Sequence, residues 1–510
     1  MPRYAAIDIG SNSVRMEAAE VLPGQAPKVL GSDREVTRLG ESVFRTGSVS
    51  EEALKTTCAV LARMATLYRK LDAVGVRAVA TSAIRDASNQ KDFLARASEA
   101  AGTQVEIISG REEARLIHLG VESVWPQKGK RVLILDVGGG SAEIIAAEDG
   151  HLVEAFSRPL GAVRLRENFL MEDPPPPYAL RQMSEFIGEK LSASVQRLGK
   201  KGWDRAIATS ATASAAASAV ARTPRSKREE IDRQRVTTPQ VRQLYSKLAT
   251  AGVAARRKVT GIGPRRAEII VPGLAVLLQF LVEFQLPALY YSRAGVRDGI
   301  IADLAGRNVG AELSRLARDQ RAEVEEMCRR YGVSLAHARK VANLTAMLFT
   351  ALQPAHQLPP AVGKLLEAAA YLHDVGHYIS NVSHHKHSWY VVANSDMPGF
   401  TERERMVIAA MCRYHRKALP NTQHNAFEAL TPDERKAVTL GIPILRLADN
   451  LDRSHEQRVL GVECKVRDSG DIAMVVSAKG DIDLEQWAAQ RAGDVFREIY
   501  GRAISITRAK

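Results

Sequence analysis

The sequence of 510 residues contains little cysteine, few aromatic residues and no long uninterrupted apolar run. Its four cysteines are scattered without C-x-x-C spacing, which indicates free thiols in a reducing compartment rather than a disulfide framework or a zinc site. Aromatic residues make up only 5% of the chain and do not interleave with the basic residues, so stacking on nucleic-acid bases is poorly supported. We therefore do not expect nucleic acid as a partner.

A membrane-spanning segment and a signal peptide are also not expected. The most apolar helical stretch, residues 271–284, is interrupted by Pro272, Gly273, Gln279 and Glu283. Residues 1–4 lead directly into the apolar residues 5–7, without the basic region and long apolar run of a signal peptide. These patterns predict a cytoplasmic protein with no membrane partner.

Acidic residues are too few to balance the basic ones. The chain has 71 Lys and Arg against 58 Asp and Glu, a formal net charge of +13. Such an excess favours a polyanionic partner, such as nucleic acid, an acidic membrane or a phosphate-rich small molecule. A solvated basic surface without any partner explains the same charge, so individual motifs must decide.

The apolar pattern changes along the chain. Over the first 300 residues strand-like and helix-like segments alternate, which predicts an α/β fold, and the length favours three or four domains. The expected strands are Tyr4–Asp8, Arg77–Thr81, Val105–Ser109, Arg131–Asp136 and Arg205–Thr209, and helices are expected at Glu51–Leu71 and Glu112–Val121. From about residue 310 the pattern is all-helical, and the last 50 residues predict a small α+β segment.

One short pattern occurs twice. Residues 8–13 and 136–141 share D-x-G-x-x-S, each directly after an apolar strand. Two copies about one domain length apart predict two similar domains that face each other across a cleft. A chance pair of glycine turns is the alternative.

Both turns have the composition of a phosphate-binding site. Glycine lets the backbone turn tightly and bring several N–H groups to one anion, and small polar side chains add donors. Asp8 and Asp136 would repel phosphate unless a cation lay between them, so they are expected ligands of Mg²⁺ or Mn²⁺, with Glu143 as a further candidate. Turn capping is the alternative role for each aspartate.

These residues resemble the exopolyphosphatase/guanosine pentaphosphate phosphohydrolase family, part of the actin-like, sugar-kinase and heat-shock ATPase superfamily. Residues 8–15 (DIGSNSVR) and 136–143 (DVGGGSAE) resemble its two phosphate loops. Further segments match in order, at residues 80–89 (ATSAIRDASN), 108–115 (ISGREEAR), 264–273 (PRRAEIIVPG) and 297–299 (RDG). The resemblance covers essentially the whole chain.

The resemblance implies that Glu113 is the catalytic carboxylate, a general base for water; the residues alone do not distinguish it from Glu112. It also implies a homodimer with a basic channel along its interface. Three arginines are candidate phosphate clamps, because guanidinium groups match phosphate oxygens in pairs. The expected phosphate-binding residues are Gly10, Ser11, Asn12, Ser13, Arg15, Arg85, Gly138, Gly139, Gly140, Ser141 and Arg266.

One segment departs from the family. Residues 208–212 read A-T-S-A-T, whereas the family has G-x-S-G-T. Alanine in place of glycine closes this loop against a bulky group. Because the region lies near the nucleoside in related kinases, the change favours inorganic polyphosphate over a guanosine substrate.

A second set of candidate ligands lies in the helical region. His337, the adjacent His373 and Asp374, and Asp449 suit a divalent ion. Their order, with Val-Gly after the His-Asp pair, resembles the HD superfamily of metal-dependent phosphohydrolases, which implies a second divalent metal. Five further histidines are candidates for another metal or for phosphate: His377, His384, His385, His387 and His415. A purely structural His–Asp hydrogen bond is the alternative.

The predicted architecture is two actin-like domains (residues 1–128 and 129–305), an all-α HD-type domain (306–457) and a small α+β domain (458–510). The predicted activity is Mg²⁺-dependent hydrolysis of the terminal phosphate of inorganic polyphosphate. The alternatives are hydrolysis of guanosine pentaphosphate (pppGpp) to ppGpp, phosphate transfer by a kinase of this fold, and a regulator that binds polyphosphate or alarmone without turnover. Intact Glu113, Asp136 and Glu143 argue against the regulator, because binding alone needs no water-activating base.

Overall fold

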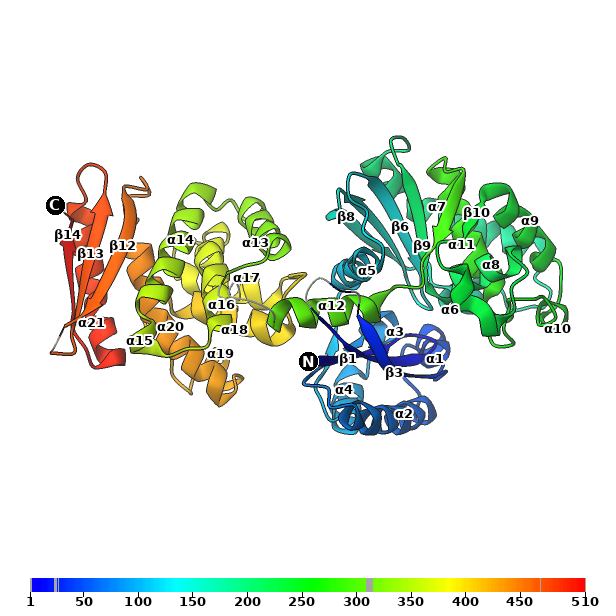
Figure 1. The fold of residues 1–510 in the computed structure, drawn as a ribbon, viewed down its shortest axis with the longest axis horizontal. Helices are drawn as coiled ribbons and strands as arrows, with labels where there is room; N and C mark the ends of the chain where they lie inside the picture. Colours follow the sequence, from blue (N-terminus) through cyan, green and yellow to red (C-terminus); the bar gives the residue numbers. More distant parts are fainter. Residues whose placement is uncertain (1, 23–24, 26, 309–314, 468, 510) are drawn as a thin grey trace. The chain divides into compact units, whose positions relative to one another are not determined.

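The computed structural model describes residues 2–22, 25, 27–308, 315–467 and 469–509. The chain divides into two compact units, Met1–Asn308 and Val309–Lys510, and each is described by itself (Figure 1). In the described ranges, no helix combines the length and the hydrophobicity needed to cross a bilayer. The apolar stretch near residue 271 is helix α11 (Ile270–Glu283), whose side chains are largely buried in the first unit.

The first sheet of the first unit has the order β3-β2-β1-β4-β5. Its first three strands form an antiparallel meander, and the other two join the opposite edge of β1 in parallel after helical connections. The elements are β1 (Arg3–Ile9), β2 (Val14–Glu20), β3 (Lys28–Glu35), α1 (Leu39–Thr46), α2 (Glu51–Lys70), β4 (Gly75–Ala80), α3 (Ser82–Asp86), α4 (Gln90–Ala101), β5 (Val105–Ile107) and α5 (Gly110–Val124).

The second sheet repeats this plan with the order β10-β11-β9-β6-β7-β8. Strands β6 to β8 form the antiparallel meander, and β9 and β11 add in parallel. The elements are β6 (Arg131–Val137), β7 (Ala142–Glu148), β8 (His151–Arg158), α6 (Ala162–Phe169), α7 (Pro177–Leu198), β9 (Arg205–Thr209), α8 (Ser210–Val220), η1 (Arg225–Ile231), β10 (Arg235–Thr237), α9 (Thr238–Ala249), α10 (Val253–Arg256), α11, β11 (Ala288–Tyr291) and α12 (Val296–Asn308). The repeated D-x-G-x-x-S pattern therefore corresponds to a repeated topology.

Helix α5 lies between the two sheets and packs on both. Ala114, Ile117 and Val121 belong to a core cluster with β6, β7 and β9 of the second sheet. Leu116 belongs to a cluster with β1, β2 and β4 of the first sheet and with α12. A helix that is apolar on several faces is expected where it is buried on all sides. The hydroxyl of Ser109 accepts a hydrogen bond from Glu112 N at the start of α5, so this residue caps the helix instead of continuing the predicted strand.

Helices α5 and α12 cross with very close backbones. A Cβ atom on Gly299 would lie 1.7 Å from the carbonyl oxygen of Leu116, so only glycine fits at this crossing. Beside the crossing, Arg115 of α5 binds Asp303 of α12 at 3.0 Å, and Arg77 of β4 binds the same aspartate at 3.2 Å. These buried ion pairs join α12 to α5 and to the first sheet.

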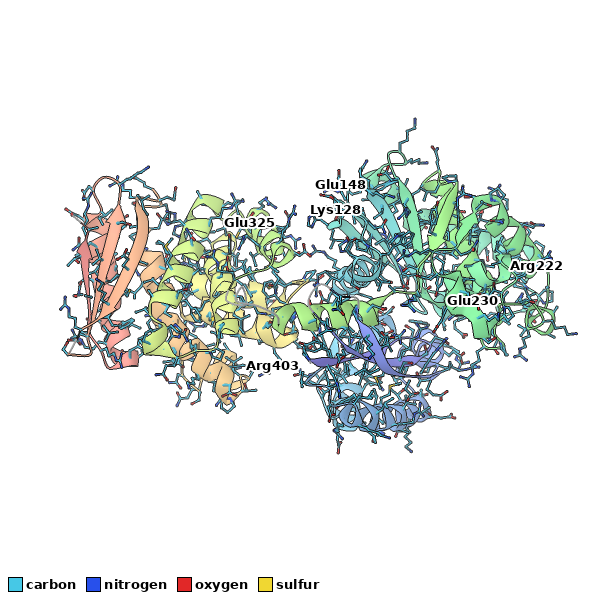
Figure 2. All side chains as sticks on the ribbon, viewed as in Figure 1. Lys128, Glu148, Arg222, Glu230, Glu325 and Arg403 are labelled. Carbon is cyan, nitrogen blue, oxygen red and sulfur yellow. The ribbon has the colours of Figure 1, made fainter. Side chains whose placement is uncertain are left out.

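The second unit begins with helices that share one hydrophobic core. On its surface Glu325, labelled in Figure 2, accepts two hydrogen bonds from Arg339, at 2.7 and 2.8 Å. The elements are α13 (Arg318–Arg330), α14 (Leu335–Ala351), α15 (Gln353–His356), α16 (Pro360–Leu372), η3 (Val375–Tyr378), α17 (His384–Asn394), α18 (Glu402–Tyr414), α19 (Asn425–Glu428) and α20 (Pro432–Asn450).

The last residues form a three-stranded sheet covered by a helix, with the order β12-β13-β14. Strands β12 and β13 pair antiparallel, and β13 and β14 pair in parallel across the connecting helix. Val459, Met474 and Phe496 lie in the same core cluster as the preceding helices. The elements are β12 (Val459–Val466), β13 (Ile472–Ala478), α21 (Asp483–Tyr500) and β14 (Ile504–Arg508).

Candidate active site

The two D-x-G-x-x-S motifs form equivalent hairpin turns, one between β1 and β2 and one between β6 and β7. In the first, Gly10 N donates to Ser13 O at 3.2 Å; in the second, Gly138 N donates to Ser141 O at 3.0 Å. None of these glycines, nor Gly139 or Gly140, has a positive φ. Glycine at these positions is therefore explained by the close approach of neighbouring atoms and not by a left-handed backbone conformation.

The two turns lie against each other. A Cβ atom on Gly139 would be 3.0 Å from Ser11 Cβ and 3.3 Å from Asn12 N. A Cβ atom on Gly140 would be 2.7 Å from Ser11 Oγ. Ser11 itself is buried, and its hydroxyl accepts a hydrogen bond from Ala83 N at the start of α3. The first unit thus brings both predicted phosphate loops to one place.

Strand register places a charged residue beside each aspartate. Asp8 pairs with Arg15 across β1 and β2, and Asp136 pairs with Glu143 across β6 and β7. Arg15 and Glu143 occupy the same position of the repeated hairpin. The residue opposite the aspartate is therefore basic in the first hairpin and acidic in the second. The D-x-G-x-x-S pattern does not include this position.

The structure separates the roles of Glu112 and Glu113. Glu112 accepts hydrogen bonds from Arg115 at 2.7 and 2.9 Å and from Arg77 at 3.1 Å, so its carboxylate is taken up by the buried ion network. Glu113 lies one residue further along the first turn of α5, and its carboxylate is near those of Asp8, Asp136 and Glu143. Its cationic neighbour is Arg85, at 3.4 Å.

Four carboxylates gather at this point. Burial and the carboxylates of Glu143, Asp8 and Asp136 raise the pKa of Glu113 well above its ordinary value, although Arg85 opposes the shift. Burial and Glu143 raise the pKa of Asp136 to about 8. Burial also raises the pKa values of Asp8 and Glu143. Carboxylates this close hold protons more tightly than free carboxylates do, unless a cation compensates their charge.

The predicted arginine clamps occupy three different settings. Arg85 donates to the backbone oxygen of Ile108 at 2.5 Å as well as to Glu113, so it also orients the carboxylate. Arg15 Nε donates to Ser13 Oγ at 3.3 Å. Arg266 lies between α10 and α11 and donates to Thr212 Oγ1 at 3.4 Å. Arg15 and Arg266 both lower the pKa of Asp136, against burial and Glu143, which places their charges near the carboxylates.

Arg164 is a further site residue that sequence reasoning missed. Its Nε donates to Gly140 O at 2.7 Å and its Nη2 donates to Ser82 Oγ at 3.1 Å and to Asp86. The guanidinium also lies over the ring of Phe44, 4.0 Å from its centroid. Arg164 thus connects the second hairpin turn to helices α1 and α3, which pack beside the first sheet. Its only sequence signal was an arginine three residues after Gly161, at the start of a helix.

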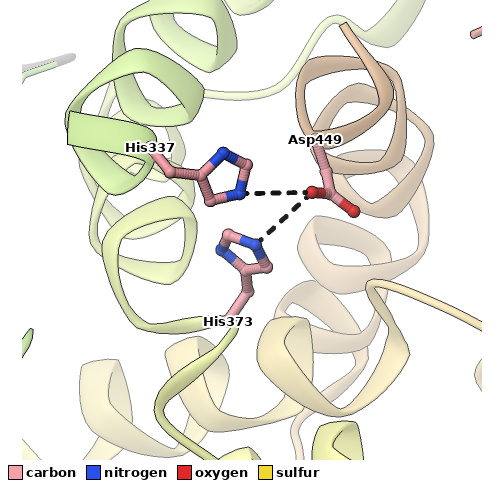
Figure 3. Close-up of side chains that lie close together, drawn as sticks. All are labelled: His337, His373 and Asp449. Atoms are coloured by element: carbon pink, nitrogen blue, oxygen red, sulfur yellow. Dashed lines mark ion pairs between the residues drawn. The ribbon is translucent and has the colours of Figure 1, made fainter. Parts of the chain in front are cut away.

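The predicted quartet of the helical region also comes together, within the second unit. His337 Nε2 and His373 Nε2 lie 3.6 and 3.5 Å from Asp449 Oδ1 (Figure 3). Asp374 Oδ2 lies 3.4 Å from His373 Nε2. Of the five surrounding histidines, His377, His384 and His415 have Nε2 within 4.0 Å of Asp374 Oδ1. Among the described residues, two groups of side chains could hold a metal ion: His337, His373 and Asp449, and Asp374, His377 and His384. His385, His387 and His415 are in neither group.

The fold of the first unit, with two lobes of repeated topology and facing hairpin turns, defines an actin-like phosphate-handling protein. A solved Ppx/GppA family member from Aquifex aeolicus is 28% identical with a TM-score of 0.53, and the match covers 61% of this chain and 99% of that one. An exopolyphosphatase structure from Cytophaga hutchinsonii, 23% identical, shares the fold with a TM-score of 0.55 over 60% of this chain and 98% of that one.

Family models extend the match beyond the fold. The model of the Ppx/GppA phosphatase family matches residues 18–308, and that of Ppx/GppA phosphatase, domain III, matches residues 320–486. A relative from Aeromonas hydrophila subsp. hydrophila, guanosine-5'-triphosphate,3'-diphosphate pyrophosphatase, is 27% identical over 475 residues, 92% of this chain and 89% of its own. The chain belongs to the Ppx/GppA phosphatase family, whose members act on phosphoanhydride bonds.

Proposed function

We propose that the protein hydrolyses the terminal phosphoanhydride bond of inorganic polyphosphate, with Glu113 as the general base for water. The observation that supports this proposal is that the Glu113 carboxylate lies near Asp8, Asp136 and Glu143 of the two hairpins and outside the ion network that occupies Glu112. Glu113 accepts a proton from the attacking water. The water oxygen forms a new bond to the terminal phosphorus, and the bond to the bridging oxygen breaks, which releases orthophosphate and a shortened chain.

The carboxylates around Glu113 fit a divalent cation such as Mg²⁺ or Mn²⁺. Glu143 is buried, its Oε1 accepts from Ser157 at 2.8 Å, and its Oε2 has no hydrogen-bond partner among the described residues. Asp8, Asp136 and Glu143 would hold the ion, all through oxygen ligands of the type that Mg²⁺ prefers. A bound ion would neutralise charge on the phosphoryl oxygens of the substrate.

Two arginines of the chain supply positive charge without a cofactor. Arg15 and Arg266 lie near the carboxylates and suit paired contacts to phosphate oxygens. Arg85 binds Glu113 directly and fixes its orientation. A phosphate chain is thus met by basic groups at the turns and by one base that faces the terminal phosphorus.

Two substrates are candidates for this site. Polyphosphate is favoured by the segment that departs from the family, because Ala208 and Ala211 replace glycines and leave less room for a bulky nucleoside. Guanosine pentaphosphate is the second candidate, because the relative from Aeromonas hydrophila is named for a guanosine substrate. Both use the same phosphate chemistry, so substrate preference is a question for measurement.

The test measures orthophosphate release with Mg²⁺ from long-chain polyphosphate, guanosine pentaphosphate and ATP in turn. Glu113→Gln keeps the side-chain shape but removes the base, so we expect kcat to fall by about 10²- to 10⁴-fold. Glu122→Gln is the matched control, because it makes the same change near the other end of α5. A Glu113→Gln variant that releases phosphate from polyphosphate at the wild-type rate would rule out the mechanism.

A further inference from the structure

Ser157 lies beside Glu143, one of the residues that would hold the divalent cation. The two residues are directly opposite each other where β7 and β8 pair, so their side chains project from the same face of the second sheet. The hydroxyl of Ser157 donates to Glu143 Oε1 at 2.8 Å. Nothing in the proposed mechanism uses this hydroxyl, and Ser157 lies outside the motifs that mark the site in the sequence.

Three strands of the second sheet place a row of side chains on one face. Asp136 of β6 is opposite Glu143 of β7, and Glu143 is opposite Ser157 of β8. The corresponding row of the first sheet is Asp8, Arg15 and Arg34. The repeated topology therefore has a neutral hydroxyl at the third position of one row and a guanidinium at the third position of the other.

A hydroxyl orients a carboxylate without cancelling its charge. An arginine or lysine that bound Glu143 from the position of Ser157 would neutralise the carboxylate and compete with a metal ion for it. A serine donates one neutral hydrogen bond and leaves the negative charge available to a cation. The neighbour that β8 supplies to Glu143 is therefore suited to hold a metal-binding carboxylate in place.

The two oxygens of Glu143 have different surroundings. The residue is 0% exposed, and Oε1 is held by Ser157. Oε2 is buried and has no hydrogen-bond partner in the part of the chain that the structure describes. A buried carboxylate oxygen without a partner is unfavourable by itself, and a divalent ion would satisfy it.

Ser157 also contacts the helix that carries Glu113. A Cβ atom on Gly110, the first residue of α5, would lie 2.2 Å from Ser157 Cβ and 2.6 Å from Ser157 Oγ. Glycine at this position therefore leaves room for the hydroxyl. Gly110 and Glu113 are three residues apart, so they lie on the same side of the helix. Ser157 thus packs against the turn of α5 that carries the proposed base while it holds Glu143.

We propose that Ser157 is a positioning residue, whose hydroxyl fixes Oε1 of Glu143 so that Oε2 is available to the divalent cation. This inference rests on the proposed function, because it takes Glu143 to be a ligand of that cation. In this role Ser157 acts only through Glu143 and takes no part in the making or breaking of bonds.

The first experiment measures Mg²⁺ binding to the full chain by isothermal titration calorimetry, without a phosphate substrate. Glu143→Gln identifies the component of binding that depends on this carboxylate. Ser157→Ala is expected to raise the Kd of that component by about 10- to 100-fold, the usual cost of removing a group that orients a metal ligand. Ser123→Ala is the matched control, because this hydroxyl donates to Gly120 O within α5, and it should leave the Kd unchanged.

Ser157→Cys separates the hydrogen bond from packing. A thiol is close to a hydroxyl in size but is a weak donor, so this variant should bind Mg²⁺ as weakly as Ser157→Ala. Wild-type affinity in either variant would overturn the proposal. Mg²⁺ binding that Glu143→Gln does not reduce would instead refute the cation site itself, and the role of Ser157 with it.

The second experiment follows phosphate release from polyphosphate as a function of Mg²⁺ concentration. Ser157→Ala should need about 10-fold more Mg²⁺ than wild type for half its maximal rate. Its kcat at saturating Mg²⁺ should stay close to that of wild type, because Glu113 is intact. A loss of kcat that saturating Mg²⁺ does not restore would indicate a structural defect and overturn the assignment of Ser157 as a positioning residue.

Discussion

Gly161 gives a sharp test of how tightly the second hairpin turn must be positioned. The residue precedes α6 with φ −69° and ψ 146°, a conformation that alanine adopts without strain. Its added Cβ atom would lie 2.3 Å from the backbone carbon and oxygen of Gly139 and from the backbone carbon of Gly140. Ordinary contact begins at 3.4 Å, so the turn must shift by about 1 Å.

We expect Gly161→Ala to lower kcat/KM for polyphosphate by about 10²-fold, or about 2.7 kcal/mol, because a displacement of about 1 Å costs that much in a positioned site. Overpacking should cost about 1–3 kcal/mol of unfolding free energy, measured in urea. Gly188→Ala in α7 is the control, since its Cβ meets Gln279 at an ordinary 3.4 Å. A folded Gly161→Ala variant with wild-type kcat/KM would refute this account of the turn.

Two further predictions concern charges. Arg85→Ala removes the cation that lowers the pKa of Glu113 against burial, so the acidic limb of kcat/KM should move to higher pH; an unmoved limb would contradict the contact. Asp303→Asn removes one of the two buried carboxylates that Arg77 and Arg115 share, Glu112 being the other, and should lower the unfolding free energy at pH 7 by about 2 kcal/mol in urea. Burial opposes ionisation of Asp303, but Arg115, Arg307 and Arg77 together outweigh burial and lower the pKa. The stabilisation is therefore present above the unfolded value of 3.8 and is lost as pH falls below it, so an equal deficit at pH 3 and pH 7 would count against the assignment.

The elements and the repeat could be read from the sequence because each depends on local pattern. The strand expected at Tyr4–Asp8 is β1, and the helix expected at Glu51–Leu71 is α2, each within two residues. The paired motifs predicted facing turns because the same pattern follows the same kind of strand twice. The grouping of His337, His373 and Asp449 in space was equally readable, because residue type and order mark it.

The remaining site features depend on contacts between distant segments. Glu112 and Glu113 are adjacent and chemically identical, so only the rotation of α5 about its axis distinguishes them. Glu112 binds Arg77 and Arg115, whereas Glu113 binds Arg85. Arg164 acts through Gly140, which lies in another element, so no spacing rule marks it. Asp452 was missed for the same reason, because its role is to hold His337 from behind.

The position of α5 between the two sheets connects the relative position of the two lobes to the position of Glu113. The helix packs on both sheets and is fastened to α12 by Gly299 and by the Arg115–Asp303 pair. Because α5 packs on both sheets, a rotation that separates the lobes built on these sheets would shift α5 relative to at least one of them. Glu113, a residue of α5, would shift with the helix. Under the mechanism proposed above, a separation of the lobes would therefore also carry Glu113 away from one of the two hairpin turns.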